Sequence, residues 1–212
     1  MLEHLPDAVG LALRDKRAGL DKIAFNQVDL RQGAGAITVA SLAFADHAPI
    51  PADYTADGAG LSPPLQWSGV PPQAQSVVVI VEDADAPTPQ PIVHAIVVGL
   101  EGANGSLAPG ALPSPGHDPV ADVTAGRNSY LRARWLPPDP PPGHGTHRYV
   151  FQVFALEAGA GLGGTPGRGA VLDALRSHGI AGGYLVGTYA RPDGAVRIAE
   201  VEAAKAPAVR RV

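Results

Sequence analysis

The run from Val77 to Val81, "VVVIV", constrains the fold most, because it offers β-branched side chains to both faces of any extended element. Such side chains favour extended backbone, and successive residues of a strand point to opposite faces, so the pattern is typical of a strand buried on both sides. The chain then turns through "EDADAP" and returns as "IVHAIVV" (Ile92 to Val98). The sequence therefore predicts two buried strands, with Asp83, Asp85 and His94 near the turn that joins them.

The rest of the chain reads as further short strands with few helices. Glycine and proline are abundant, at 26 and 22 residues, and they follow no period, which favours a loop-rich β protein. Helices are predicted over 5–18 and 169–180, and a linker over "RQGAGA" at 31–36. Strands are predicted over 37–44, 66–67, 76–82, 93–100, 148–156 and 184–189. The long stretch between residues 100 and 148 is polar and proline-rich, as functional loops often are.

These elements predict an all-β domain with peripheral helices. We expect an N-terminal helical extension and linker over residues 1–35, a β-sandwich domain over 36–191, and a C-terminal tail over 192–212. The extension is expected to cover an edge of the domain, with a homodimer contact as the alternative role.

Composition excludes several classes of function. With 45% hydrophobic and 17% charged residues the chain is globular, and a net charge of −4 without a basic cluster argues against nucleic acid as a partner. The absence of cysteine excludes disulfides and thiolate metal sites. No signal peptide or membrane-length apolar run is present, so we expect a cytoplasmic protein without stable membrane insertion. The glycines at 159–164 lack the acidic strand end of a dinucleotide site, and no cofactor is expected.

Two segments carry the candidate site residues. Strand alternation places Asp83 and Asp85 on one side and puts His94 on the face of Ile92, Ile96 and Val98. Pro87 restrains the turn, and the Ala86–Pro87 bond is a candidate for the cis form.

The second segment is "PPDPPPGHGTHRYVF", in which alternation places His147, Tyr149 and Phe151 on one face. A histidine beside a carboxylate favours its cationic form, so two histidines and a tyrosine hydroxyl could donate hydrogen bonds to an anion. His144, by contrast, is assigned to a loop or to solvent.

Five motifs together resemble one family. They are "DGAGLSPPLQWSGVP" (57–71), "DADAP" (83–87), His94, "PPDPPPGHGTHRYVF" (137–151) and "GTYAR" (187–191), in that order. The chain resembles the phosphatidylethanolamine-binding proteins, also called Raf kinase inhibitor-like proteins, in their bacterial branch. The resemblance implies an antiparallel β-sandwich of a large and a smaller sheet, with a small anion pocket at one end.

The same resemblance implies that Asp83, His94, His147 and Tyr149 line the pocket, with Asp85 and Pro87 supporting it from behind. The chain departs from the family pattern at Ile92 and Ala95, where aromatic residues usually flank the histidine, and at Pro137, where glycine is usual. These departures predict a wider mouth that is less suited to phosphate.

The favoured function is a soluble, regulatory ligand-binding protein for a small anion such as phosphate, a carboxylate or phosphorylethanolamine. An enzyme that uses Asp83 and His94 for acid–base chemistry on a small metabolite is the alternative, and it is less favoured because no nucleophile motif is present. A protein–protein regulator, like the kinase inhibitors among animal relatives, is the third reading. No metal site is expected, because the acidic and histidine residues lack close ligand spacing.

Overall fold

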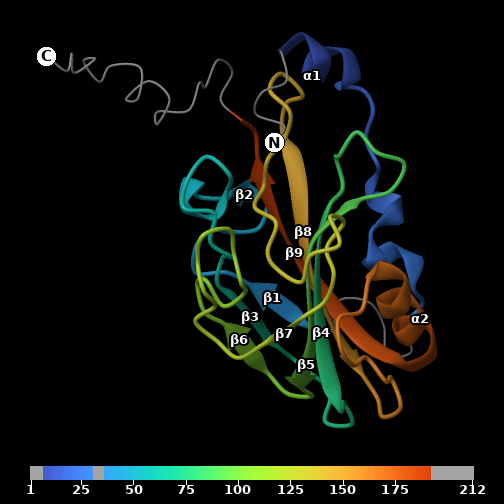
Figure 1. Cartoon of the computed structure of the whole chain (residues 1–212). Helices are drawn as coiled ribbons and strands as arrows, with labels where there is room; N and C mark the ends of the chain where they lie inside the picture. Colours follow the sequence, from blue (N-terminus) through green and yellow to red (C-terminus); the bar gives the residue numbers. More distant parts are fainter. Residues whose placement is uncertain (1–6, 31–35, 192–212) are drawn as a thin grey trace, which may run out of the picture.

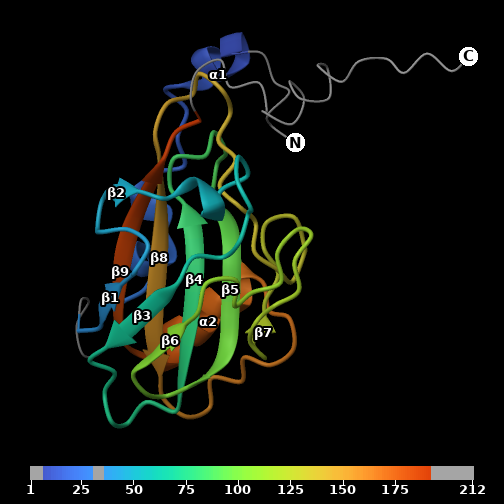
Figure 2. The same cartoon turned by 90° about the vertical axis from the view of Figure 1, so that its left-hand side faces the viewer.

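The protein is a sandwich of two β-sheets, seen here in a computed structural model that describes residues 7–30 and 36–191 (Figures 1 and 2). The larger sheet has the order β2-β9-β8-β4-β5-β7 and the smaller has β1-β3-β6, and neither closes into a barrel. All strand pairs are antiparallel except β2 with β9. The strands are β1 Thr38–Ala40, β2 Ala48–Pro49, β3 Leu65–Ser68, β4 Ser76–Asp83, β5 Ile92–Glu101, β6 Gly105–Leu107, β7 Thr124–Ala125, β8 His147–Leu156 and β9 Gly179–Tyr189. The helices are α1 Asp7–Leu13 and α2 Arg168–His178, with 3-10 turns η2 Leu20–Lys22, η3 Ala24–Gln27 and η4 Ala52–Tyr54.

Strand β4 is buried on both faces, as its run of valines predicts. Val79 and Val81 pack in the core between the two sheets, whereas Val78 and Ile80 pack against the apolar side of α2. Figure 2 shows the small sheet on one side of the large sheet and α2 on the other. The prediction of a β-sandwich with few helices is confirmed, and the two-sided burial explains why β4 carries no hydrophobic–polar alternation.

Strand β9 begins at Gly179, five residues earlier than predicted. Its glycines do not interrupt the strand, because they are the residues at which other segments pack closely against it. A Cβ on Gly183 would lie 1.8 Å from the carbonyl oxygen of Ile37, and one on Gly187 would lie 2.6 Å from Ile50. These glycines look like strand breakers in the sequence, but here they let a crossing segment approach the sheet. Packing therefore decides the start of the strand.

The N-terminal segment runs along the outside of the large sheet. Helix α1 ends at Leu13, short of the predicted end at residue 18. Beyond it, the N–H groups of Ala18 and Gly19 donate to the carbonyls of Ala86 and Ala84, at 2.9 and 2.8 Å. The segment thus pairs with the turn after β4. The start of the predicted helix, the linker over 31–35 and the tail from 192 lie outside the described residues.

The stretch from residue 126 to 136 lies along β5, although no strand is assigned there. Its backbone N–H groups at Gly126, Ser129 and Leu136 donate to carbonyls of β5. This segment carries one wall of the site described next. The described residues contain no cis peptide bond, so the Ala86–Pro87 bond is trans and the suggested cis form is wrong.

Candidate functional site

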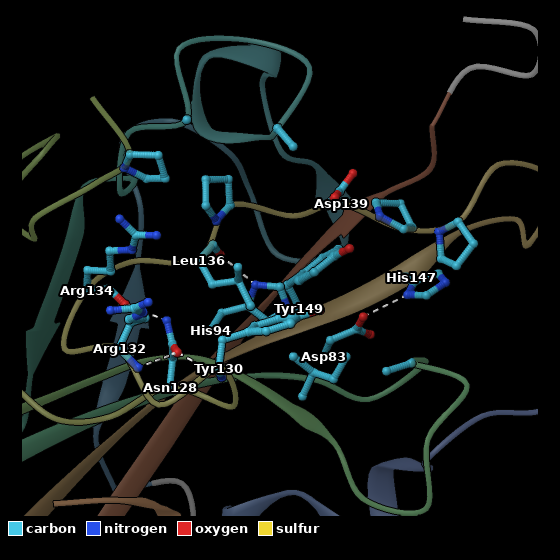
Figure 3. A pocket seen from close by; sticks show the side chains of 18 of the residues that line it. Asp83, His94, Asn128, Tyr130, Arg132, Arg134, Leu136, Asp139, His147 and Tyr149 are labelled. Atoms are coloured by element: carbon cyan, nitrogen blue, oxygen red, sulfur yellow. Dashed lines mark hydrogen bonds and ion pairs between the residues drawn. The ribbon is translucent and has the colours of Figure 1, made fainter. Parts of the chain in front are cut away.

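His94 reaches the site because β5 carries a bulge at that residue. Val81 of β4 lies opposite Ala95 and Glu82 lies opposite Val93, so His94 is an extra residue with no partner across the ladder. A bulge re-aims a side chain, and this one turns the imidazole toward the cavity (Figure 3). The predicted face is therefore right for Ile92, which lines the cavity with His94, and wrong for Ile96 and Val98, which pack toward α2.

A backbone carbonyl fixes the tautomer of His94. Its Nδ1–H donates to the carbonyl oxygen of Leu136 at 2.6 Å, since a carbonyl can only accept. Burial lowers the pKa of His94, although the negative charge of Asp83 opposes the shift. The ring is thus neutral near pH 7, contrary to the cationic form expected from the sequence. Its buried Nε2 is an acceptor with no partner among the described groups.

Asp83 and two histidines form a chain of hydrogen bonds behind the cavity. The Nδ1–H of His147 donates to Asp83 Oδ2 at 2.8 Å, and its Nε2 lies 2.6 Å from Nδ1 of His144. Nε2 of His144 donates in turn to the carbonyl of Leu13, at 2.8 Å. His144 lies in a loop, as predicted, but it is buried there and not in solvent.

Both nitrogens of His147 lie within hydrogen-bond distance of protein groups, so this ring has no free donor for a ligand. Burial lowers the pKa of His144, which lies at the other end of the chain of hydrogen bonds.

Tyr149 supplies a second buried polar atom without a partner. The residue is 0% exposed, and its hydroxyl makes no hydrogen bond within the described chain. Burial raises the pKa of Tyr149 well above its usual value, so the hydroxyl keeps its proton. The ring lies edge-on to His94, with centroids 5.1 Å apart. It packs among the side chains of the core between the two sheets. The predicted shared face of His147, Tyr149 and Phe151 is confirmed.

These side chains converge on one cavity of about 550 Å³. Figure 3 shows His94 and Tyr149 at its centre, Asp83 and His147 to one side, and Arg132 and Arg134 to the other. Among the residues that the sequence singles out, those on the cavity wall are Asp83, Pro87, Ile92, His94, Pro137, His147 and Tyr149.

Asp85 does not share the side of Asp83, because β4 ends at Asp83 and the chain turns. The carboxylate of Asp85 accepts from the backbone N–H, Nε and Nη2 of Arg148, at 2.8, 2.7 and 2.7 Å, and lies 3.2 Å from Arg17. Asp83 Oδ1 in turn accepts the N–H of Asp85 at 2.8 Å. Asp85 thus anchors the turn to β8 on the opposite face of the sheet.

A second ion cluster ties the rim of the cavity together. Arg191 lies 3.0 Å from Asp57 and donates to Asp139 at 2.5 Å, and the hydroxyl of Tyr189 donates to Asp57. Ion pairs therefore connect two of the family motifs, which contain Asp57 and Arg191, to the proline-rich segment that contains Asp139. Sequence reasoning missed this cluster. The arginine that ends the motif "GTYAR" was the available signal.

Two kinds of feature are absent from the described residues. No group of three histidine, aspartate or glutamate side chains there could hold a metal ion. Neither helix there has the length and apolar character to cross a membrane.

A concave cavity that is lined mostly by apolar atoms and holds a few convergent polar groups is typical of sites that bind small molecules. This chain belongs to the phosphatidylethanolamine-binding protein family, whose model matches residues 40–190. UPF0098 protein Rv1910c of Mycobacterium tuberculosis is 39% identical over 156 residues, which cover 72% of this chain and 70% of the relative. UPF0098 protein PH1269 of Pyrococcus horikoshii is 35% identical over 152 residues, covering 71% and 75%. The family resemblance noted from the motifs is confirmed.

Solved structures agree with this assignment. CT736 of Chlamydia trachomatis, described as a homologue of the family, is 34% identical with a TM-score of 0.66, covering 74% of this chain and 99% of its own. YbcL of Escherichia coli is 27% identical with a TM-score of 0.66, covering 74% and 100%. LppC of M. tuberculosis, named as a candidate lipoprotein, is 38% identical over 155 residues, covering 72% of each chain. Relatives therefore include a protein with a different expected location, and the cytoplasmic assignment stays a prediction.

Proposed function

We propose that the protein binds a small anionic ligand in the cavity lined by Asp83, His94, His147 and Tyr149. The observation that carries this proposal is the pair of buried polar atoms, His94 Nε2 and Tyr149 Oη, that lack partners in the described chain. Buried polar groups are nearly always hydrogen-bonded, and an unpaired one costs about 1–3 kcal/mol. Two of them on one cavity wall are ready to bind a polar ligand.

The other candidate residues have supporting tasks in this proposal. Asp83 faces the cavity while its two oxygens accept from Asp85 and His147. His147 holds Asp83 in place through a hydrogen bond. Because both of its nitrogens are already bonded, a ligand can meet only the carbon edge of its ring. A few hydrogen bonds of about 1.5–3 kcal/mol each support an affinity in the micromolar to millimolar range.

Calorimetric titration with phosphate, acetate and phosphorylethanolamine tests the proposal. Wild type should bind at least one of them at millimolar concentration, and His94→Leu should weaken binding about tenfold or more. His47→Gln, a change at an exposed histidine, is the matched control and should bind like wild type. Absence of heat with all three ligands at millimolar concentration would count against the proposal.

Acid–base catalysis is the second candidate, and the neutral state of His94 favours it. A general base needs a free lone pair near a substrate proton, and His94 Nε2 has one in a cavity beside Asp83. A metabolite screen should then reveal turnover by wild type that His94→Ala loses. Equal behaviour of the two proteins in every assay would dismiss catalysis.

A homodimer formed through the N-terminal helix and a regulatory role stay predictions. Size-exclusion chromatography with light scattering measures the first, since a monomer mass at all concentrations would refute it.

A further inference from the structure

The N-terminal segment consists of two parts that are held to the domain in different ways. Residues 18–30 are anchored by burial: Ala24 is 0% exposed, and its N–H donates to the buried carboxylate of Glu82 at 2.6 Å. In residues 7–17, which we call the arm, every residue from position 11 onward is exposed or half-buried. Both parts precede the residues 40–190 that match the family. The arm therefore lies outside the family domain, and burial does little to hold it.

The arm packs against the loop that leads into β8. The carbonyl of Leu13 accepts the Nε2–H of His144 at 2.8 Å, and Arg17 donates to two carbonyls of the loop at 2.9 and 3.2 Å. A Cβ on Gly10 would lie only 1.8 Å from the carbonyl oxygen of Pro142, so the backbone of α1 touches the loop. Figures 1 and 2 both show α1 beside this loop.

Two paths of polar contacts lead from the arm to the carboxylate of Asp83. The first runs from the arm through the rings of His144 and His147 and ends at Oδ2 of Asp83, with distances of 2.8, 2.6 and 2.8 Å. The second begins at Arg17, which lies 3.2 Å from Asp85, and the N–H of Asp85 donates to Oδ1 of Asp83 at 2.8 Å. Both oxygens of a carboxylate on the cavity wall are thus connected to the arm.

The arm also backs part of the cavity wall. Pro140 and Pro141 line the cavity, and the residues that follow them, Pro142 and His144, contact the arm. Each contact of this kind changes an equilibrium by only about two- to tenfold. Because few such contacts hold the arm, it can open without unfolding of the domain.

We propose that the arm positions the carboxylate of Asp83, and that opening of the arm is coupled to binding in the cavity. Leu13 and Arg17 are positioning residues that act through the histidines and through Asp85. The coupling rests on the proposed function, whereas the positioning does not. Because coupling between two sites is reciprocal, a bound ligand should hold the arm closed.

The double variant Gly10→Ala with Arg17→Gln opens the arm and leaves the cavity wall intact. Alanine favours a helix more than glycine does, so propensity alone would stabilise α1, whereas the added Cβ would meet Pro142. Asp85 keeps its three hydrogen bonds from Arg148. Arg14→Gln is the matched control, because its side chain is 65% exposed and lies near only the exposed Asp15.

Hydrogen exchange measures the opening. The N–H groups of Lys16, in the arm, and of His144, beneath α1, should exchange about tenfold faster or more in the double variant than in wild type. The control should match wild type, and the N–H of Ala24 should stay within about twofold in every variant, which shows that the domain remains folded. Unchanged exchange of Lys16 and His144 in the double variant would overturn the role of these contacts.

Nitrogen-15 spectra of the histidine side chains measure the positioning. Loss of the acceptor at Leu13 frees Nε2 of His144, so the imidazole signals of both His144 and His147 should move in the double variant and stay in place in the control. His147 decides the question, because it is bonded to His144 and Asp83. An open arm with unchanged His147 signals would show that the arm only covers the domain, and the positioning would be refuted.

The coupling is tested with phosphorylethanolamine, phosphate and acetate as probes. A saturating probe should slow the exchange of Lys16 in wild type about fivefold or more, whereas the N–H of Gly163, in a loop after β8, should be unaffected. The double variant should bind the same probe about threefold or more weakly, and this loss must not exceed the factor by which the probe slows Lys16.

The outcomes separate this inference from the proposed function. Binding by wild type without any change in the exchange of Lys16 would overturn the coupling and leave the proposed function standing. Failure of wild type to bind any of the three probes would refute the proposed function and the coupling together, and the His147 signals would still decide the positioning.

Discussion

Replacing Tyr149 by phenylalanine should change stability and binding in opposite directions. The substitution removes a hydroxyl that is buried and unpaired in the described chain, and it preserves the ring that packs in the core. An unpaired buried polar group costs about 1–3 kcal/mol. We take the lower figure because the hydroxyl borders a cavity, and we expect Tyr149→Phe to raise the free energy of unfolding by about 1 kcal/mol. For a chain of this size that raises Tm by roughly 2–4 °C.

The same substitution should weaken ligand binding. The hydroxyl is a donor without a partner in the described chain, on a residue that lines the cavity. Losing a hydrogen bond to a polar ligand costs about 1.4 kcal/mol, or tenfold in Kd. Urea unfolding gives the stability, provided that the slope with denaturant is unchanged, and calorimetry with phosphorylethanolamine gives the affinity. Gain of stability with loss of affinity identifies a group kept for function.

Tyr189→Phe is the matched control, because its hydroxyl is satisfied. That hydroxyl donates to Asp57, and burial together with this hydrogen bond raises the pKa of Tyr189 to about 12. Its removal leaves the rim cluster short of a donor, so we expect a loss of about 1 kcal/mol in stability. If Tyr149→Phe instead destabilises the protein like Tyr189→Phe and binds phosphorylethanolamine like wild type, the hydroxyl of Tyr149 is structural and the reasoning fails.

Three further predictions concern the turn, the pH dependence and the backbone. Asp85→Asn should lower stability at pH 7 by about 3 kcal/mol in urea unfolding, since it weakens a buried ion pair. Burial alone would raise the pKa of Asp85, but hydrogen bonds from its arginine partner outweigh burial and lower it. Its stabilisation is therefore present above about pH 4 and is lost as pH falls through the folded pKa, so wild type and variant should converge in acid. Binding of acetate, whose charge is constant over this range, should be flat from pH 8 to about 6.5 and tighten below, since the pKa of His94 is lowered and its protonation adds a positive charge beside the anion; calorimetry showing weaker binding in acid would contradict this. Gly183→Ala should cost roughly 1–3 kcal/mol in thermal unfolding, because its Cβ would lie 1.8 Å from the oxygen of Ile37, whereas Gly163→Ala, with no neighbour within 4 Å, should be neutral.

Local patterns predict the strands of the large sheet, because a strand that is buried on both faces is apolar along most of its length. The β-branched run of β4 predicts burial on both faces, and the alternation of β8 places His147, Tyr149 and Phe151 on one face; both predictions agree with the structure. Strands β2, β6 and β7, with two or three residues each, were missed, since such segments are too short to show a period. Packing partners that are distant in sequence define them.

The site is harder to predict because its geometry depends on departures from regular structure. The bulge at His94 reverses the face that alternation assigns, and the end of β4 sends Asp85 away from Asp83. Neither event has a signature in a window of a few residues. His144 and Asn128 lie in irregular segments, where no period indicates burial, and each acts through hydrogen bonds to backbone or side chains distant along the chain.

The pairing of charges explains how a cavity with many titratable groups can still discriminate between ligands. A buried charge without a partner is costly, so an acidic residue such as Asp83 is tolerated only with a counter-charge fixed beside it. Both nitrogens of His147 are bonded within the protein, so it has no donor for an anion, and the neutral His94 is an acceptor because of its bond to Leu136. Attraction for an anion must then come from groups that solvent keeps charged at low cost, and exposed guanidinium groups meet that condition.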